Sequence, residues 1–166
     1  MFQIGDIIIY GSQGVCTVEK IGQLDISPKI KDKLYYTLKP LYHHDTVFYV
    51  PVEFEKSVLR AIISTEEAKQ LISEIKDIPT VWIQSEKERE QQYKQALRTC
   101  DCKELVRVIK TLYERKKSRI KDGKKVTALD EKYFRQAEEQ LYGELSVVLG
   151  IEKSKVAEYI TNENQG

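Results

Sequence analysis

The periodicity of the apolar residues changes at about residue 62, and this change constrains the fold more than any other feature of the sequence. In the first part, β-branched and aromatic residues occur in short runs separated by turn residues, a pattern typical of β-strands. The five expected strands cover residues 7–10, 15–21, 34–39, 47–52 and 58–62. Two glycines in Gly11-Ser12-Gln13-Gly14 provide a tight turn, and residues 25–32 and 40–45 form longer connections. This part predicts a small, strongly curved antiparallel sheet or a partly closed β-barrel.

After residue 62 the strand signals stop, and four helix starts follow in succession. In each start, a side chain with an oxygen atom precedes an acidic residue by three positions, so it can accept a hydrogen bond from the first helical turn. The four starts are Ser64-x-x-Glu67, Ser85-x-x-Glu88, Asp101-x-x-Glu104 and Thr127-x-x-Asp130. Apolar residues at three-and-four spacing follow them, as in Leu105, Val108, Ile109 and Leu112. The second part therefore predicts four helices and a short fifth at 151–160, which makes the chain an α+β protein.

Pro79 marks the end of the first expected helix, because it cannot donate a backbone hydrogen bond and restricts the residue before it. We expect three segments: a β module over residues 1–62, a connecting helix and linker over 63–80, and a helical domain over 81–166.

The composition favours a cytoplasmic protein without a membrane partner. The longest apolar runs, such as Ile7-Ile8-Ile9-Tyr10, are far shorter than the roughly 20 residues of a membrane-spanning helix, and no charged-then-apolar signal opens the chain. Cys16, Cys100 and Cys102 are an odd number in a chain without a secretion signal, so we expect reduced cysteines rather than a disulfide framework. Cys100-x-Cys102 also lacks the second ligand pair of a structural zinc site.

The basic residues are concentrated in one segment, although the whole chain has a net charge of only +1. Residues 103–125 contain ten basic and three acidic residues, a net charge of +7, whereas residues 1–55 have a net charge of −2. A solvated helix face is one interpretation of this segment. Contact with a phosphate backbone, which depends on salt and not on base sequence, is the other.

Catalytic and metal-binding patterns are not found in the sequence. His43 and His44 stand next to Asp45 in an expected loop, where they form either a polar turn or part of a metal site, and the polar turn is the simpler interpretation. The chain has no phosphate-binding glycine loop, no nucleophile elbow and no metalloprotease helix motif. We therefore expect no enzyme, no cofactor, no metal and no small-molecule substrate.

Trp82 is the only tryptophan in the chain and lies near the expected start of a helix. Packing in a core or between domains is one role for it. The other is insertion at a distorted step of DNA, where an apolar side chain in the minor groove holds the bases apart.

Two sets of residues resemble a known family. Residues 2–10, 14–18, 35–38 and 50–53 are similar to the N-terminal module of CarD/CdnL-type bacterial transcription regulators, a module shared with the transcription-repair coupling factor. In the helical part, Tyr93-Lys94, residues 104–115 and residues 130–145 resemble the C-terminal domain of the same regulators. The resemblance implies a Tudor-like β module that binds the β subunit of RNA polymerase, and a helical domain that contacts promoter DNA just upstream of the melted region.

The resemblance also implies two sets of binding residues. Those expected against polymerase are Leu24, Val47, Tyr49 and Pro51. Those expected against DNA, at the backbone and minor groove with little base specificity, are Trp82, Arg89, Lys94, Lys132 and Arg135.

Two positions depart from the pattern of the family. Tyr49 stands where the family has an arginine against polymerase, so a contact there would be aromatic rather than ionic. The family's DNA-wedging tryptophan falls on Arg89, and Trp82 lies seven residues before it. Either the start of this helix is extended and Trp82 is the wedge, or Trp82 packs and the wedge is absent.

These features predict a non-catalytic regulator that is cytoplasmic and associated with the nucleoid through polymerase. It would change the stability of the open promoter complex, and the direction of regulation is left open. The alternative is a Tudor-like adaptor that binds protein and not DNA.

Overall fold

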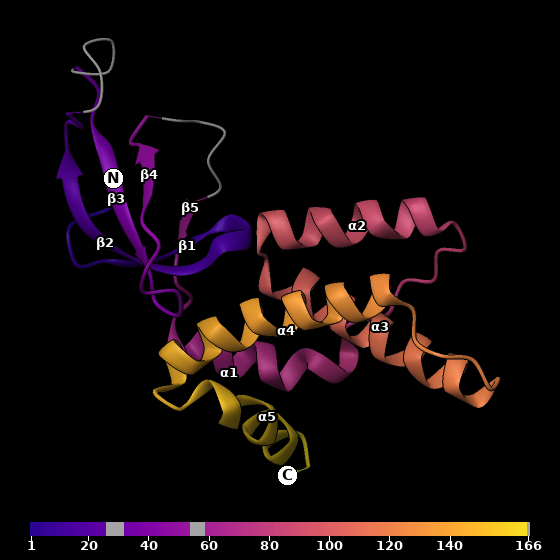
Figure 1. Ribbon diagram of the computed structural model, residues 1–166. Helices are drawn as coiled ribbons and strands as arrows, with labels where there is room; N and C mark the ends of the chain where they lie inside the picture. The colour runs from indigo at the N-terminus through magenta and orange to yellow at the C-terminus, as the bar shows by residue number, and fades with distance from the viewer. Residues whose placement is uncertain (26–31, 54–58, 166) are drawn as a thin grey trace. The chain divides into compact units, whose positions relative to one another are not determined.

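The computed structural model describes residues 1–25, 32–53 and 59–165 (Figure 1). The chain divides into two compact units, Met1–Ile62 and Ile63–Gly166, which we call the β unit and the helical unit. The α+β class expected from the sequence is confirmed.

The β unit is a five-stranded antiparallel sheet with the strand order β4-β3-β2-β1-β5. Its strands are β1 (Ile7–Tyr10), β2 (Gly14–Gly22), β3 (Tyr35–Pro40), β4 (Phe48–Pro51) and β5 (Leu59–Ala61), and a 3-10 turn, η1 (Gly11–Gln13), joins the first two. In the described part of the chain β4 pairs only with β3 and β5 only with β1, so the sheet is open. The sequence predicted a strongly curved antiparallel sheet or a partly closed barrel, and the described strands form the antiparallel sheet without closing into a barrel.

The strands lie close to their expected positions. The last expected strand, 58–62, is observed as the three residues of β5, and Val58 lies outside the described residues. The same holds for most of the expected connection 25–32, of which residues 26–31 are not described. A register shift between Val18 and Lys20 leaves an extra residue in β2, a bulge that increases the local twist of the sheet.

The core of the β unit lies on one face of this sheet. Successive side chains of a strand point to opposite faces of the sheet, so this core is built from alternate residues of each strand. The buried members are Ile8, Cys16, Val18, Tyr36, Leu38 and Val50. At the edge of this core, the Tyr36 hydroxyl accepts a hydrogen bond of 3.1 Å from the Phe2 amide.

The helical unit contains five α-helices in its described residues. They are α1 (Thr65–Glu74), α2 (Glu86–Thr99), α3 (Cys102–Lys121), α4 (Ala128–Leu149) and α5 (Val156–Gln165), with 3-10 turns η2 (Ile75–Asp77) and η3 (Lys153–Lys155). No helix in the described residues is long and apolar enough to span a membrane.

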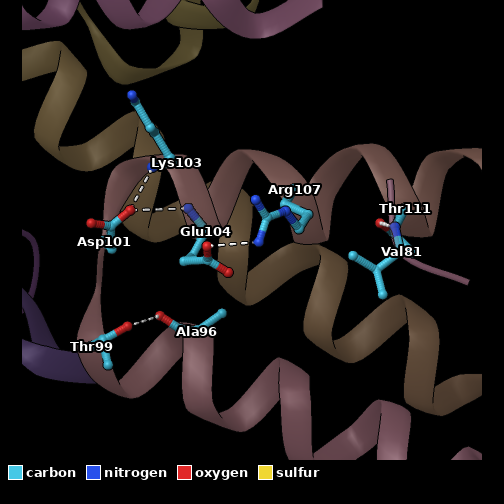
Figure 2. Close-up of polar contacts among 8 residues, drawn as sticks. All are labelled: Val81, Ala96, Thr99, Asp101, Lys103, Glu104, Arg107 and Thr111. Carbon is cyan, nitrogen blue, oxygen red and sulfur yellow. Dashed lines mark hydrogen bonds and ion pairs between the residues drawn. The ribbon is translucent and has the colours of Figure 1, made fainter. Parts of the chain in front are cut away.

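The four helix starts expected from the sequence are confirmed by their capping hydrogen bonds. The Ser64 and Thr127 hydroxyls accept from backbone amides three residues later, at 3.0 and 3.1 Å. Ser85 does the same at 3.4 Å. The Asp101 carboxylate accepts from the amides of Lys103 and Glu104, at 3.0 and 3.1 Å (Figure 2). Each cap satisfies amides that the first turn of a helix leaves without a partner.

The first helix belongs to the helical unit. Residues 63–80 were expected as a connecting helix and linker; α1 ends at Glu74 and η2 at Asp77, both before Pro79. Helix α1 packs against α4 and α5. The buried carboxylate of Glu144 in α4 also accepts a hydrogen bond of 3.3 Å from the Ile63 amide, which fixes the chain just before α1.

Candidate functional site

Three of the four expected polymerase-binding residues share one face of β4 and its N-terminal extension. Val47, Tyr49 and Pro51 alternate with Val50, which is buried in the core. Tyr49 is 51% exposed and Val47 is 41% exposed, so this face is directed away from the core. Among the described strands β4 lies at an edge of the sheet, and an edge strand can pair with a partner strand or loop.

Leu24, the fourth expected polymerase-binding residue, lies near the Pro51 end of this face. It follows the last residue of β2, Gly22, by two positions. Gly22 pairs with Tyr35, and Tyr35 pairs with Pro51. Val47, Tyr49 and Pro51 form an apolar and aromatic surface, which we call the β4 face, and Leu24 lies beyond the end of β2, the second strand from β4.

In the helical unit, the structure brings together the two lysines expected to contact DNA. Lys94 of α2 forms an ion pair of 3.4 Å with Glu90. The Tyr133 hydroxyl of α4 donates a hydrogen bond of 3.0 Å to the same carboxylate oxygen. Lys132 lies over the Tyr133 ring, with 5.3 Å between its Nζ and the ring centroid. Lys94 thus pairs with Glu90 directly, whereas Lys132 contacts the tyrosine that donates to it and acts on the carboxylate at longer range. We call this group of four residues the lysine cluster.

The electrostatics of the lysine cluster follow from these contacts. The pKa of Glu90 lies below its ordinary value, first because Tyr133 donates to it and also because Lys94 and Lys132 attract its negative charge. Burial and the Glu90 hydrogen bond raise the pKa of Tyr133, so its phenol stays protonated. Two lysines and one carboxylate leave a net positive charge that suits a phosphate group.

Arg135 lies three residues after Lys132 in α4, which places the two side chains on neighbouring positions of one helix face. Its guanidinium pairs with Glu131 at 3.3 Å, but the two side chains are 77% and 63% exposed. Such a surface pair is weak, so Arg135 can exchange Glu131 for another anion.

Trp82 lies on the irregular segment between η2 and α2 and is 60% exposed. It is therefore not a core residue of the helical unit. Arg89 has a different environment, because its Nη1 donates hydrogen bonds to the carbonyls of Ile83 and Gln84 at 2.9 and 2.7 Å. Of the two positions considered for a wedge, the exposed aromatic side chain is at Trp82, and Arg89 is engaged with the backbone.

Part of the basic segment 103–125 is used inside the fold. Lys110 donates to the carbonyls of Ile75 and Ile78 at 2.7 and 2.5 Å. Arg115 forms an ion pair of 3.0 Å with Asp130, in which the two side chains are only 14% and 4% exposed. The sequence pattern counts these residues as surface charge, since their partners lie far along the chain.

Other cations of this segment remain on the surface. The Arg119 side chain donates to the Lys125 carbonyl at 2.7 Å, and Lys117 lies over the Tyr113 ring, 5.2 Å from its centroid. The exposed lysines are Lys116, Lys117, Lys121, Lys124 and Lys125. This end of α3 and the following loop therefore keep a positive surface.

Metal-binding and redox groups do not come together in the described residues. No set of three or more His, Cys, Asp or Glu side chains there could hold a metal ion, and His43 and His44 are exposed. None of the three cysteines, all of which lie in the described residues, forms a disulfide bond. Burial in the β core raises the pKa of Cys16 to about 12, which makes it an unreactive thiol.

The chain thus combines a five-stranded antiparallel β unit with a unit of five α-helices in its described residues. Comparison with protein families gives a match for each part: the CarD-like/TRCF RID domain matches residues 2–63, and the CarD C-terminal domain matches residues 70–161. A search of curated proteins gave no match. The chain belongs to the CarD family, whose domains are those of non-enzymatic transcription factors that interact with RNA polymerase.

Proposed function

We propose that this protein binds the β subunit of RNA polymerase through the β4 face and promoter DNA through the helical unit, and so changes the stability of the open complex. The observation that carries the DNA part is the 60% exposure of Trp82 in a unit that also holds the lysine cluster. An exposed indole and surface cations are the groups that bind distorted DNA with little base specificity. No metal or cofactor takes part in this function.

The polymerase contact is supported by the match of residues 2–63 and by the geometry of β4. Tyr49 occupies the centre of the exposed face, and its ring offers a large contact area at a low entropic cost. An edge strand can also add backbone hydrogen bonds to a partner.

The DNA contact follows from the lysine cluster and Trp82. Lys94, Lys132 and Arg135 contact phosphates, and Trp82 enters the minor groove at the edge of the melted region. Phosphate contacts set the position of a protein on DNA, whereas a wedge recognises the distortion of the duplex. The protein would therefore prefer a partly melted promoter to an intact duplex.

The mechanism is thermodynamic. Binding to polymerase raises the local concentration of a DNA-binding surface that is weak by itself. The protein can shift the equilibrium between the closed and open promoter complexes only by the difference between its affinities for the two complexes. If promoter opening is the slow step, a protein that prefers the open complex activates transcription. If promoter escape is the slow step, the same preference represses transcription.

A second candidate function is an adaptor that binds protein and not DNA. The observation that favours it is the internal use of Lys110 and Arg115, which lowers the positive charge available to DNA. An adaptor should show no dependence of DNA affinity on salt, whereas phosphate contacts give a linear loss of affinity with the logarithm of salt concentration.

The DNA contact is tested with the full chain, RNA polymerase and a promoter fragment with a fork junction. We expect Trp82→Ala to shorten the lifetime of the open complex roughly tenfold, the effect of losing one aromatic stacking contact. The double variant Lys94→Ala, Lys132→Ala should reduce the salt dependence of DNA binding.

Each test variant has a control in the same unit. The control for Trp82→Ala is Ile120→Ala, at a 57% exposed apolar residue of α3. The control for the lysine variant is the double variant Lys69→Ala, Lys155→Ala, at two exposed lysines. Equal effects of control and test variants would reject the DNA contact.

The polymerase contact is tested by co-purification. Tyr49→Ala should weaken the binding of polymerase and leave the affinity for free DNA unchanged. Tyr113→Ala is the matched control, because Tyr113 is also 51% exposed but lies in the helical unit. Unaltered polymerase binding by Tyr49→Ala would rule out the β4 face.

A further inference from the structure

The segment that carries Trp82 has no regular secondary structure, yet its backbone is held by side chains on both sides of the tryptophan. Residues 78–85 lie between η2 and α2, where no helix or strand pairs their amides and carbonyls. Such groups need partners when they are removed from water. Helices α2 and α3 supply them from three side chains.

The first contact holds the chain before Trp82. Lys110 of α3 is half-buried, and its ammonium group donates to the carbonyls of Ile75 and Ile78 at 2.7 and 2.5 Å. A third carbonyl, that of Lys76, lies 3.4 Å from the same nitrogen. Hydrogen bonds from a charged donor are stronger than those between neutral groups. Lys110 therefore ties the end of η2 to α3.

The second contact is one residue before Trp82. The amide of Val81 donates a hydrogen bond of 3.1 Å to the Thr111 hydroxyl (Figure 2). Thr111 is only 4% exposed, so this contact is shielded from water. Thr111 directly follows Lys110, and two successive residues of α3 thus bind the same connecting segment.

The third contact follows Trp82 directly. Arg89, one turn into α2, donates from one nitrogen to the carbonyls of Ile83 and Gln84 at 2.9 and 2.7 Å. The residues on either side of Trp82 are therefore bonded to α3 and to α2, respectively.

The side chains of this segment are directed in an alternating manner. Val81 and Ile83 line a cavity of about 50 Å³ together with Tyr93 and Val108. Trp82, between them, is 60% exposed. The two neighbours thus face the helical unit, and the indole faces away from it.

We infer that Lys110, Thr111 and Arg89 are positioning residues, which fix the backbone around Trp82 and so hold its indole ready for binding. The inference rests on the proposed DNA contact of Trp82 for its functional meaning. A side chain that must be ordered when it binds loses conformational entropy at that moment. The three contacts order the backbone of Trp82 before DNA arrives, and the affinity for DNA is higher as a result.

The test uses the fluorescence of Trp82, which reports this residue alone because the chain has one tryptophan. In the protein without DNA, Thr111→Val keeps the size of the side chain and removes the acceptor for the Val81 amide. We expect a loss of Trp82 fluorescence anisotropy, since the segment gains local motion. Thr111→Ser restores the hydroxyl and should restore the anisotropy. The matched control is Thr99→Val, which removes a hydroxyl that donates within α2, to the Ala96 carbonyl at 3.2 Å.

General unfolding of Thr111→Val is excluded if its circular dichroism spectrum keeps the helical signal. A second variant, Arg89→Met, keeps the aliphatic part of Arg89 and removes the donor to the carbonyls of Ile83 and Gln84. Loss of anisotropy in both variants, with rescue by Thr111→Ser, supports the positioning role. Unchanged anisotropy in both, or an equal loss in Thr99→Val, overturns it.

Binding to a forked promoter fragment separates this inference from the proposed function. Thr111→Val should bind the fork about fivefold more weakly, the effect of one lost hydrogen bond. If Trp82→Ala has no effect on fork binding, the proposed DNA role of Trp82 fails, whatever the anisotropy shows. If Trp82→Ala weakens binding and Thr111→Val changes neither binding nor anisotropy, the positioning role alone fails.

Discussion

The two units differ in what they bury. The core of the β unit consists of apolar side chains and one tyrosine, on alternate positions of its strands. The helical unit also buries polar groups, among them Thr111, Asp130 and Glu144, and these bind segments that are far apart in the chain. In β3 and β4, strand alternation separates the buried residues, such as Leu38 and Val50, from those available to a partner, such as Tyr49. In the helical unit, the available charges are those that the fold does not use internally.

The largest loss of stability is expected when the buried ion pair of the helical unit, Arg115 with Asp130, is broken. Arg115→Met leaves the Asp130 carboxylate, 4% exposed, without its cation, and one of its oxygens has no hydrogen-bond partner even in the intact protein. We expect a loss of about 3–5 kcal/mol in the free energy of unfolding. Urea unfolding followed by circular dichroism measures it.

The control for this prediction is Arg135→Met, which breaks an exposed pair. Its cost should be under about 1 kcal/mol. The double variant Arg115→Met, Asp130→Leu should recover much of the loss, because it leaves no buried charge unpaired. If Arg115→Met costs no more than Arg135→Met, the helical unit does not depend on its buried charges, and the contrast between the units is wrong.

The next effect tests the apolar core of the β unit. Leu38 is fully buried in β3, and Leu38→Ala should destabilise the unit by about 2–5 kcal/mol through lost burial and a residual cavity. Faster amide hydrogen exchange in β2 and β3 measures the loss. The neighbouring residue Lys39 is exposed on the other face, so Lys39→Ala should change stability by less than about 0.5 kcal/mol. Equal effects at the two positions would contradict strand alternation as the determinant of this unit.

A smaller effect is expected at a helix cap, a local polar signal that the helical unit uses at four helix starts. Thr127→Ala removes the acceptor for the Asp130 amide, which lies 3.1 Å from the hydroxyl. The expected cost is about 1 kcal/mol, measured by urea unfolding. Thr127→Ser keeps the acceptor and serves as the control. A similar loss in both variants would show that packing of the threonine methyl group matters more than the cap.

The local part of the fold could be predicted from the sequence. The helix starts were identifiable because a cap residue and its partner amide lie within three positions, as at Ser64 and Thr127. The strands were identifiable because alternation and turn residues are short-range patterns, and the exposed face of Tyr49 and Pro51 follows from the same alternation.

The remaining features depend on contacts between distant residues. Lys110 and Ile75 are 35 positions apart, and Val81 and Thr111 are 30 positions apart, so no periodicity connects them. For this reason the charge pattern of the sequence placed Lys110 among the surface cations, and no sequence pattern pointed to Thr111. The open sheet has the same origin, because closure of a barrel depends on whether β4 and β5, which are not neighbours in the described sheet, pair with each other.

The smallest expected effect concerns the charge balance of the lysine cluster. Glu90→Gln removes the negative charge that pairs with Lys94 and attracts Lys132, while the amide oxygen can still accept from Tyr133. If the cluster contacts phosphates, the affinity for DNA should rise by about two- to threefold, and the gain should shrink at higher salt because exposed charges are screened. Binding of a labelled fork fragment at two salt concentrations measures it. The control is Glu139→Gln, an exposed carboxylate of α4 that pairs with Lys153 at 3.2 Å.

The effect of Glu90→Gln on the free energy of unfolding should depend on pH, and the sign of this dependence follows from the lowered pKa of Glu90. Because the pKa of Glu90 is lowered in the folded protein, first by the Tyr133 hydrogen bond, the ionised carboxylate contributes stability above the pKa of the unfolded chain. This contribution is lost as the pH falls through the lower pKa of the folded state. The difference in unfolding free energy between the protein and Glu90→Gln should therefore shrink below pH values near the ordinary glutamate pKa of 4.5. A constant difference through the acid range would mean that Tyr133, Lys94 and Lys132 do not hold Glu90 in its ionised form, and the two lysines would then be independent surface charges.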